Sequence, residues 1–381
     1  MSSDIAEASP FPARALFDIP RETAYFNVAA LGPLLTGSVA TAAEAVARRA
    51  RPWVIPAADW FDRSERRRAA FAALLGTAAD NIALVPAASY GFAVAAANIV
   101  LSPSQAILCI DGDFPSGINS WHRRAADSGA RLILARPEAG ESWTDALLRH
   151  WTADVALVSA SPVRWMDGAL IDLLPIAARA RQEGAALVVD ATQWIGAAPF
   201  DLDAVDPDYL VCAGYKWLLG PYGLGYLYVA PRRHEGRPLE ENWISRRGTE
   251  NFARLAEHHP VYRAGARRYD AGEQVGFELG DAAIHALDQL RIWGTARIGH
   301  HLAGVTSAIA ARLAEEGFSA ATNDPRAPHI VSVQADGRWD SDPDLARSGV
   351  FLSKRGASFR IAPHVHIDEE DIERLVAAMR P

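Results

Sequence analysis

Residues 185–229 read AALVVDATQWIGAAPFDLDAVDPDYLVCAGYKWLLGPYGLGYLYV. Three short apolar runs in this stretch are residues 186–190, 209–212 and 225–229. Apolar runs of this length without polar alternation are typical of strands that are buried on both faces. Asp190 ends the first run, and Lys216 follows the second among apolar residues and glycines. The stretch therefore predicts a buried sheet with polar side chains at the carboxyl ends of its strands, where open α/β sheets bind ligands.

The same pattern extends toward the N-terminus. Further strands are expected at residues 82–86, 106–111, 132–136 and 154–159. Helical patterns lie between several of the runs, at residues 91–100, 116–128, 143–151 and 172–184. Alternation of strands and helices predicts an α/β fold with a mostly parallel sheet of seven strands.

A different pattern begins near residue 276, where a long helical stretch precedes a smaller α+β region. Strands are expected at 329–334 and around 349–353 and 357–362, before a terminal helix that follows Asp368. Acidic residues after Asp368 suit a helix N-terminus. A chain of 381 residues exceeds the usual size of one core. We expect a large domain over 20–285 and a small α+β domain over 286–381, joined by an N-terminal arm, 1–19.

Composition and the absence of targeting signals argue against several classes of protein. The formal net charge of −8 argues against a nucleic-acid surface. The first residues show no secretory signal, and no apolar run reaches the roughly 18–20 residues that a membrane span needs. Cys109 and Cys212 each lie in an apolar stretch and are interpreted as small buried hydrophobes, so neither a disulfide nor a metal site is expected. The default expectation is a soluble cytoplasmic protein.

Lysine is scarce in this chain. All but two of its 38 basic residues are arginine, and the two lysines are Lys216 and Lys354. Arginine stays protonated and cannot form a Schiff base, whereas a desolvated lysine can. Burying a charged lysine among apolar residues is costly, so Lys216 is expected to be neutral or partnered. The alternatives are a loop lysine with its amine in solvent and, for Asp190, a turn or capping aspartate.

Pyridoxal 5′-phosphate (PLP) would make use of both residues. Its aldehyde needs a lysine, and its ring accepts electrons when a carboxylate keeps the pyridine nitrogen protonated. Its phosphate needs a cradle, and PAASYGFAVAAANIV (86–100) places small residues and Ser89 where a helix begins, with free backbone N–H groups. The three elements in this order indicate a PLP site.

With these residues in place, the chain resembles the class V aminotransferase group of fold-type I PLP enzymes over roughly residues 20–380. The motifs that carry the resemblance are VVDATQWIGAAPFDL (188–202), GYKWLLGPYGLGYLYV (214–229) and RGASFRIAPHVHIDEEDIERL (355–375). Relatives in this group include cysteine desulfurases, kynureninases and isopenicillin N epimerase-like proteins. The resemblance implies the fold-type I architecture, PLP as cofactor, an amino-acid-like substrate, and a homodimer with active sites at the interface.

The resemblance also implies roles for single residues around the cofactor. Asp190 would pair with the pyridine nitrogen, Gln193 would reach the phenolic oxygen, and Lys216 would form the Schiff base. Ser89 and the backbone at Tyr90 would hold the phosphate.

Two aromatic residues complete this cofactor site. Tyr215 would add its hydroxyl to the phosphate contacts. Phe114 occupies the position of a ring that covers the cofactor, often a histidine; phenylalanine can stack there but cannot move a proton.

On the substrate side, Arg360 matches the arginine that grips the α-carboxylate, which fixes the bond that stands perpendicular to the cofactor ring. Asn27 and Ala29 lie in YFNVAALGPL, which resembles the segment that lines the substrate site. Relatives bring a loop around Gly272 to the phosphate of the partner subunit. Glu273 stands here where some of them have threonine, which puts that contact in question.

Several departures from the family limit the reaction. No cysteine follows Cys212, and Tyr215 replaces a histidine, so a persulfide-forming desulfurase is disfavoured. Arg164 and Trp165 replace an asparagine and an aromatic residue of kynureninases, so kynurenine is not implied. Lys216 would exchange the α-proton. An aminotransferase or a β-lyase of the C–S lyase type is favoured over an epimerase or racemase.

Two alternatives lie outside this enzyme class. A nucleotide-dependent dehydrogenase would carry G-x-G-x-x-G directly after an early strand, but the glycines at 220–225 precede a strand. A non-catalytic regulatory protein on the same fold would bind PLP without reacting with amino acids.

Overall fold

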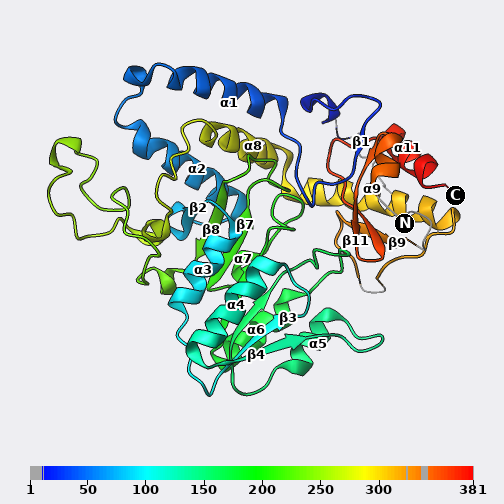
Figure 1. Cartoon of the computed structure of the whole chain (residues 1–381), viewed down its shortest axis with the longest axis horizontal. Coiled ribbons are helices and arrows are strands. Elements are labelled where there is room, and N and C mark those ends of the chain that lie inside the picture. Colours follow the sequence, from blue (N-terminus) through cyan, green and yellow to red (C-terminus); the bar gives the residue numbers. More distant parts are fainter. Residues whose placement is uncertain (1–10, 12, 323–324, 336–341, 381) are drawn as a thin grey trace, which may run out of the picture.

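The computed structural model describes residues 11, 13–322, 325–335 and 342–380. A seven-stranded sheet forms its centre, in the order β2-β8-β7-β6-β5-β3-β4 (Figure 1). The strands are β2 (Ile82–Val85), β3 (Ala106–Ile110), β4 (Arg131–Ala135), β5 (Val155–Ala160), β6 (Ala186–Asp190), β7 (Tyr209–Ala213) and β8 (Gly225–Val229). Strand β8 is antiparallel to both of its neighbours, while the other pairs in the sheet are parallel. The predicted mostly parallel sheet is therefore confirmed, with every predicted strand in place.

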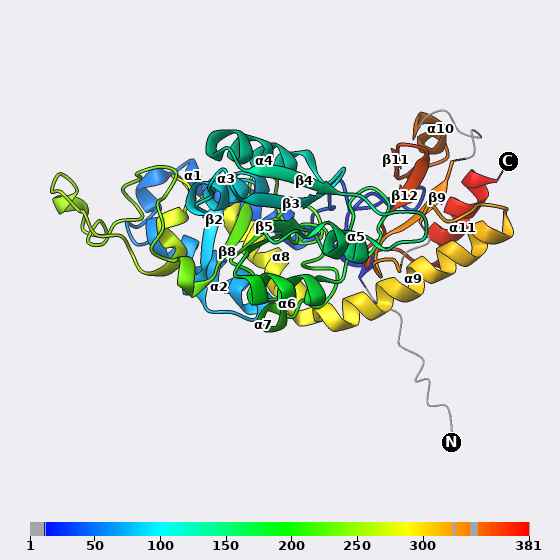
Figure 2. The same ribbon diagram turned by 90° about the horizontal axis from the view of Figure 1, so that it is seen from below.

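Helices cover both faces of this sheet (Figure 2). The predicted helices are α3 (Ala88–Asn98), α4 (Pro115–Ser128), α5 (Trp143–His150), α6 (Leu173–Glu183) and α8 (Gly280–Trp293), which begins the long helical stretch expected from near residue 276. Further helices are α1 (Thr36–Arg49), α2 (Asp59–Leu75) and α7 (Leu202–Val205). Strand β2 illustrates the layering, because Ile82 and Leu84 face one hydrophobic cluster and Ala83 and Val85 face another. Helices α3 and α4 contribute to the second cluster, and α2, α6 and α8 to the first. Both faces of the sheet are thus buried, as its apolar runs predict.

The C-terminal part forms a smaller α+β unit. It contains α9 (Thr295–Glu315), β9 (Val331–Gln334), α10 (Asp342–Arg347), β10 (Val350–Phe351), β11 (Ser353–Arg355), β12 (Ser358–Ile361) and α11 (Glu369–Met379). Strands β11, β12 and β9 form an antiparallel sheet. The N-terminal strand β1 (Ala24–Tyr25) pairs with β10. Asp368 and Asp371 form a capping box at the start of α11, in agreement with the predicted helix start. The domain division stays a prediction, and most of the arm 1–19 lies outside the described residues.

Short 3-10 helices complete the fold at Arg14–Leu16, Pro52–Val54, Ala79–Asn81, Pro231–Arg233, Phe252–Arg254 and Gly265–Tyr269. Cys109 and Cys212 are both buried, as expected of small hydrophobes. Across the part of the chain that is described, no helix combines the length and apolar character needed to cross a bilayer.

Three histidines, His329, His364 and His366, are fully buried, and the rings of the first two pack against Trp217, the residue after Lys216. His329 Nε2 lies 2.5 Å from Gln193 O, and His366 Nε2 lies 2.9 Å from Tyr25 O. These N–H groups donate to carbonyls, which leaves the Nδ1 atoms unprotonated. Burial lowers the pKa of His329 and of His366 to about 4 and the pKa of His364 well below its usual value. All three rings are therefore neutral in the folded protein near pH 7.

We expect this cluster to make the protein sensitive to acid. The unfolded chain takes up protons near pH 6.5 while the folded chain resists them until about pH 4, so the free energy of unfolding decreases as the pH falls between these values. His329 and His366 each contribute up to about 3 kcal/mol. Urea unfolding at pH 7.5 and pH 5 measures the loss. His329→Gln should reduce its dependence on pH, the exposed control His258→Gln should not, and equal losses in both variants would contradict the assignment.

Candidate active site

A cavity of about 230 Å³ lies at the carboxyl ends of the parallel strands. Its walls come from the segments that follow β2, β3, β5, β6 and β7, which are far apart in the sequence. The predicted residues that line it are Ser89, Phe114, Asp190, Gln193, Tyr215 and Lys216. Residues of its wall to which the sequence analysis gave no role in the site are Asp113, Ser116, Ser161, Trp165, Thr192 and Tyr222. The predicted cofactor residues of the large domain, apart from Tyr90 and Gly272, therefore meet in one cavity.

Lys216 lies in the turn after β7 with only 6% of its surface exposed. No carboxylate of the described residues lies within ion-pair distance of its amine. Burial lowers the pKa of Lys216 to about 8, against the opposing attraction of Asp190. Its Nζ atom lies 5.2 Å from the centre of the Phe114 ring. A desolvated amine with this pKa is partly neutral near pH 8, which is the form that attacks a carbonyl carbon.

The backbone of Lys216 is fixed by close packing. Gly32 N–H donates to Tyr215 O at 2.8 Å, and a Cβ atom at Gly32 would come within 2.2 Å of Lys216 O. A Cβ atom at Gly196 would lie 2.4 Å from Trp217 O, and the φ of this glycine is +100°. Because neither position has room for a side chain, the two glycines let two separate segments pack against the lysine turn.

Two half-buried carboxyl groups, those of Asp113 and Asp190, lie in the cavity wall. Asp190 ends β6 and accepts the Thr192 N–H at 2.9 Å, while burial raises its pKa. Asp113 accepts the Phe114 N–H at 2.7 Å and the Ser161 hydroxyl at 3.2 Å. Burial and the charge of Asp190 raise the pKa of Asp113 to about 7. Sequence analysis missed Asp113, although its position just after a strand, like that of Asp190, was a usable signal.

The proposed phosphate end of the cavity lies at the start of α3. This helix begins at Ala88 without a side-chain cap, and the segment from Pro86 to Ser89 lines the cavity. Uncapped N–H groups at a helix start bind anions. The Tyr90 hydroxyl points elsewhere and donates to Glu240 at 2.9 Å, and the Tyr215 ring packs 4.6 Å from that of Tyr222.

Gln193 connects the cavity to the N-terminal segment. Its amide nitrogen donates to Ala29 O at 3.0 Å, and its amide oxygen accepts the indole N–H of Trp217 at 2.7 Å. The carbonyl of Ala29 thus fixes the side chain of Gln193 in the cavity wall. The predicted contact of Gln193 with the cofactor would use the remaining N–H of its amide.

Arg360 lies on β12 behind Trp165, with 1% of its surface exposed. Its guanidinium donates to Trp165 O at 2.5 Å and to the Ser353 hydroxyl at 3.2 Å, and that hydroxyl donates to Asn27 Oδ1 at 2.6 Å. Burial and the nearby charge of Arg355 lower the pKa of Arg360 to about 9. Among the residues that the structure describes, no carboxylate pairs with this guanidinium. The structure thus brings Asn27 and Arg360, which are far apart in the sequence, into one network.

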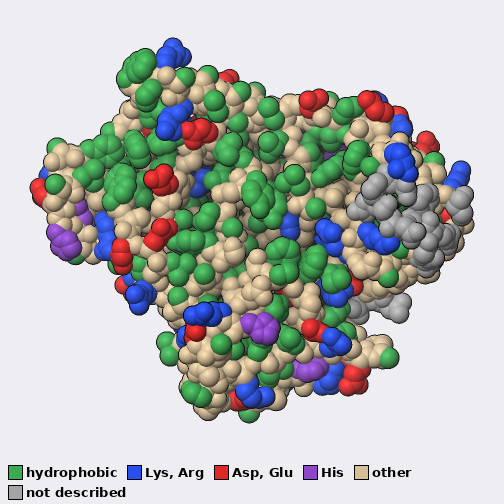
Figure 3. Space-filling view, viewed as in Figure 1, with side chains coloured by type: hydrophobic (Ala, Val, Ile, Leu, Met, Phe, Trp, Pro, Cys, Tyr) green, Lys and Arg blue, Asp and Glu red, His purple; other side chains and the backbone are tan. Residues whose placement is uncertain are grey.

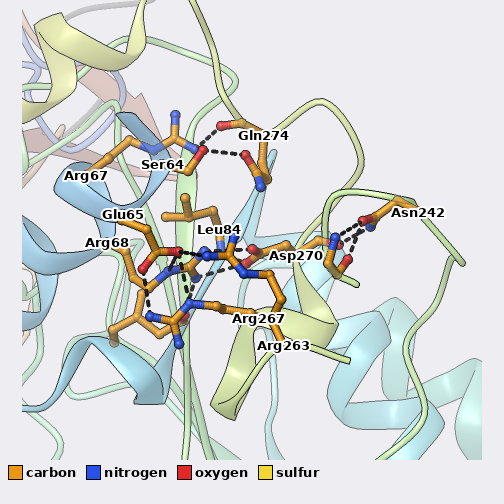
Figure 4. Close-up of polar contacts among 12 residues, drawn as sticks. Ser64, Glu65, Arg67, Arg68, Leu84, Asn242, Arg263, Arg267, Asp270 and Gln274 are labelled. Carbon is orange, nitrogen blue, oxygen red and sulfur yellow. Dashed lines mark hydrogen bonds and ion pairs between the residues drawn. The ribbon is translucent and has the colours of Figure 1, made fainter. Parts of the chain in front are cut away.

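Two arginines of helix α2 bind residues on either side of Gly272 and fix this loop (Figure 4). Arg68 binds both carboxylate oxygens of Asp270, at 3.0 and 2.7 Å, and Arg67 donates to Gln274 O at 2.6 Å. Gly272 N–H donates to Glu240 of its own chain at 2.6 Å. This loop does not line the cavity of its own chain, so its role toward a partner subunit stays a prediction.

The cavity residues fit PLP. Lys216 is buried and Asp190 half-buried; both are ionisable and without an ion-pair partner in the described chain, and both line the same cavity. A molecule with an aldehyde and a basic ring nitrogen satisfies both groups, and its phosphate matches the free helix start of α3. Phe114 supplies an aromatic wall beside the lysine.

Comparison with known proteins agrees with this assignment. The uncharacterized aminotransferase YcbU of Bacillus subtilis is 25% identical over 83% of each chain. Kynureninase of Deinococcus radiodurans is 29% identical, over 71% of this chain and 67% of the enzyme. The structure of the cystine C-S lyase C-DES with its product cysteine persulfide superposes with a TM-score of 0.83 at 20% identity, over 94% of this chain and 98% of that one, which confirms the fold-type I architecture. The aminotransferase class-V family model matches residues 55–365, so the chain belongs to this family, whose cofactor is PLP.

Proposed function

We propose that the chain is a PLP-dependent aminotransferase or β-lyase that acts on an α-amino acid with Lys216 as its acid–base group. One observation carries this proposal: Lys216 is the sole basic group among the described residues that line the cavity. Burial lowers its pKa to about 8, so its amine can both accept and return a proton near neutral pH.

Asp190 and Lys216 of the cavity wall, and the nearby Arg360, which does not line the cavity, each have a defined task in this proposal. Bound PLP would supply an electron sink for the bonds at the substrate α-carbon. Asp190 would hold a proton on the ring nitrogen, because a buried carboxylate stabilises a neighbouring positive charge. Lys216 would take the α-proton and return it. Arg360 would bind the α-carboxylate and orient the substrate.

The residue type at position 114 favours one-base chemistry. Epimerisation requires a proton donor on each face of the α-carbon. Phe114, the residue aligned with the ring that covers the cofactor, carries no exchangeable proton. Asp113 beside it is bonded to the backbone N–H of Phe114 and to Ser161. The arrangement therefore supports transamination or β-elimination over epimerisation, and the similarity to YcbU, a protein named as an aminotransferase, supports the former.

We also propose that the chain forms a homodimer. Hydrophobic side chains gather on the face of the molecule seen in Figure 3. Helix α1 and the turn after it expose Val39, Val46, Trp53 and Val54, each by 47% of its surface or more. Exposed apolar groups of this size mark interaction surfaces. A second copy of the chain would cover these side chains. The loop around Gly272 would then be available to the active site of the partner subunit. The cytoplasmic location stays a prediction.

A substrate screen on the purified holoenzyme tests the proposed reaction. Absorbance is followed near the cofactor band, at roughly 410–420 nm, while products are separated by type. Transamination yields a 2-oxo acid and the pyridoxamine form; β-elimination yields ammonia and pyruvate, with sulfide from cysteine. A racemised amino acid would contradict the one-base proposal. A band that no amino acid shifts would instead indicate a non-catalytic protein.

A further inference from the structure

A second arginine lies next to the one assigned to the α-carboxylate. Arg355, on β11, donates through Nη1 to the carbonyl of Lys354 at 3.1 Å, and its buried Nε atom has no hydrogen-bond partner. Within the described ranges no carboxylate lies at ion-pair distance from Arg355. A guanidinium has five N–H donors, so most of the binding capacity of this group is unused.

Arg355 does not line the cavity itself, but Trp165 connects its guanidinium to the cavity wall. Its ring lines the cavity, lies edge-on to Phe114 at 5.6 Å, and is fixed by an indole N–H bond to Gly112 O at 3.0 Å. The Arg355 guanidinium stands 5.8 Å from the centre of the same ring. The backbone carbonyl of Trp165 accepts from Arg360. One tryptophan therefore has Arg355 over its ring and Arg360 at its backbone.

The charges of the two arginines reach the reactive lysine. Both guanidinium groups lower the pKa of Lys216, and Arg355 lowers the pKa of Arg360. Antiparallel pairing of β11 with β12, with Ser353 opposite Arg360, holds the two arginines on adjacent strands. One α-carboxylate can neutralise only one guanidinium. The remaining guanidinium therefore attracts a second anionic group, and the pairing of the two strands sets the distance of that group from the α-carboxylate.

We propose that Arg355 binds a second carboxylate, at the end of the substrate side chain, so that the substrate is an acidic α-amino acid. This inference rests on the proposed function, because it takes Arg360 as the partner of the α-carboxylate. Its Nε atom has no hydrogen-bond partner, so the edge of the guanidinium that carries Nε can bind a carboxylate through two parallel hydrogen bonds. Neutral side chains of the same shape would leave this half-buried charge without a partner.

Pairs of acid and amide substrates test the inference on the holoenzyme. The cofactor band is titrated with L-glutamate against L-glutamine and with L-aspartate against L-asparagine. In the wild type at least one acid should bind about tenfold or more tightly than its amide, as expected of a buried charge-assisted contact. Arg355→Gln should remove this preference and leave the Kd of the amide unchanged. Arg355→Lys should retain part of it, and Arg360→Gln should weaken acid and amide by similar factors.

A second measurement needs no cofactor. In the apoprotein, glutarate should raise the Tm of the wild type more than its half-amide does, and Arg355→Gln should abolish the difference. Equal binding of acid and amide by the wild type, or an unchanged preference in Arg355→Gln, would overturn the inference. A cofactor band that shifts equally with neutral and acidic amino acids overturns only this inference. A band that responds to no amino acid overturns the proposed function, and the apoprotein measurement then decides the role of Arg355.

Discussion

Replacing Lys216 with alanine is expected to abolish turnover and the borohydride-stable attachment of PLP to the chain. Lys216 is the only basic group of the described cavity wall, and no neighbouring amine can replace it. Loss of its proton transfer alone should lower kcat by about 10²–10⁴-fold. The visible spectrum of the purified variant and its turnover of the best amino acid from the screen measure both effects.

Lys354→Ala is the matched control, since it removes the other lysine of the chain. Lys354 lies on β11 and does not line the cavity. This variant should keep its attached cofactor and its turnover. Because an alanine at position 216 also removes a buried side chain, thermal unfolding of both variants must show folded protein. A folded Lys216→Ala variant with attached cofactor would show that another residue holds PLP.

Replacing Asp190 with asparagine is expected to lower kcat by about 10²–10³-fold, the usual cost of removing one fixed electrostatic contact from a reaction centre. Asparagine keeps the shape of the side chain and its bond to the Thr192 N–H, but it removes the charge that would hold a proton on the ring nitrogen. The Kd for PLP should also increase. Stopped-flow loss of the α-proton, with the deuterated substrate as reference, assigns the defect to the chemical step.

Asp111 and Asp113 serve as controls for the Asp190→Asn variant. Asp111 also follows a parallel strand, but it pairs with Arg136 and does not line the cavity, so Asp111→Asn should behave as the wild type. Asp113 lies in the cavity wall and has a raised pKa of about 7. If Asp113→Asn caused the large loss in proton removal and Asp190→Asn did not, the carboxylate opposite the ring nitrogen would have been assigned wrongly.

Much of the fold could be predicted because its central sheet has a simple local signature. Strands that are buried on both faces must be apolar throughout, so each appears in the sequence as an uninterrupted run. Asp190 and Lys216 stand out for the same reason, as ionisable residues at the ends of such runs. The position of both in one cavity follows from the parallel order of β6 and β7.

Helix α2 illustrates what the pattern could not reveal. Its buried face includes Arg63, Arg67 and Arg68 beside Phe71 and Leu75, so its apolar periodicity is interrupted where the helix packs. These arginines are paired with groups more than 200 residues away, such as Asp270 and the carbonyl of Gln274. No local pattern in a single sequence identifies partners at that separation.

The substrate side of the site depends on such distant contacts as well. Arg360 was found through its motif, but its link to Asn27 through Ser353 joins residues at opposite ends of the chain. Arg355 is one of 36 arginines, and only its lack of a carboxylate partner in the described structure and its place over Trp165 distinguish it. Burial and the absence of a partner are properties of the folded chain.

Identifying the lysine that carries PLP is the most direct test of the role proposed for Lys216. The purified holoenzyme is reduced with borohydride and digested, and the modified peptide is identified by mass spectrometry. We expect a reduced pyridoxyl group on Lys216, in the peptide that contains GYKWLLGPYG (214–223), and none on Lys354. Modification at Lys354, or no modified lysine in a preparation that contains bound PLP, would contradict it.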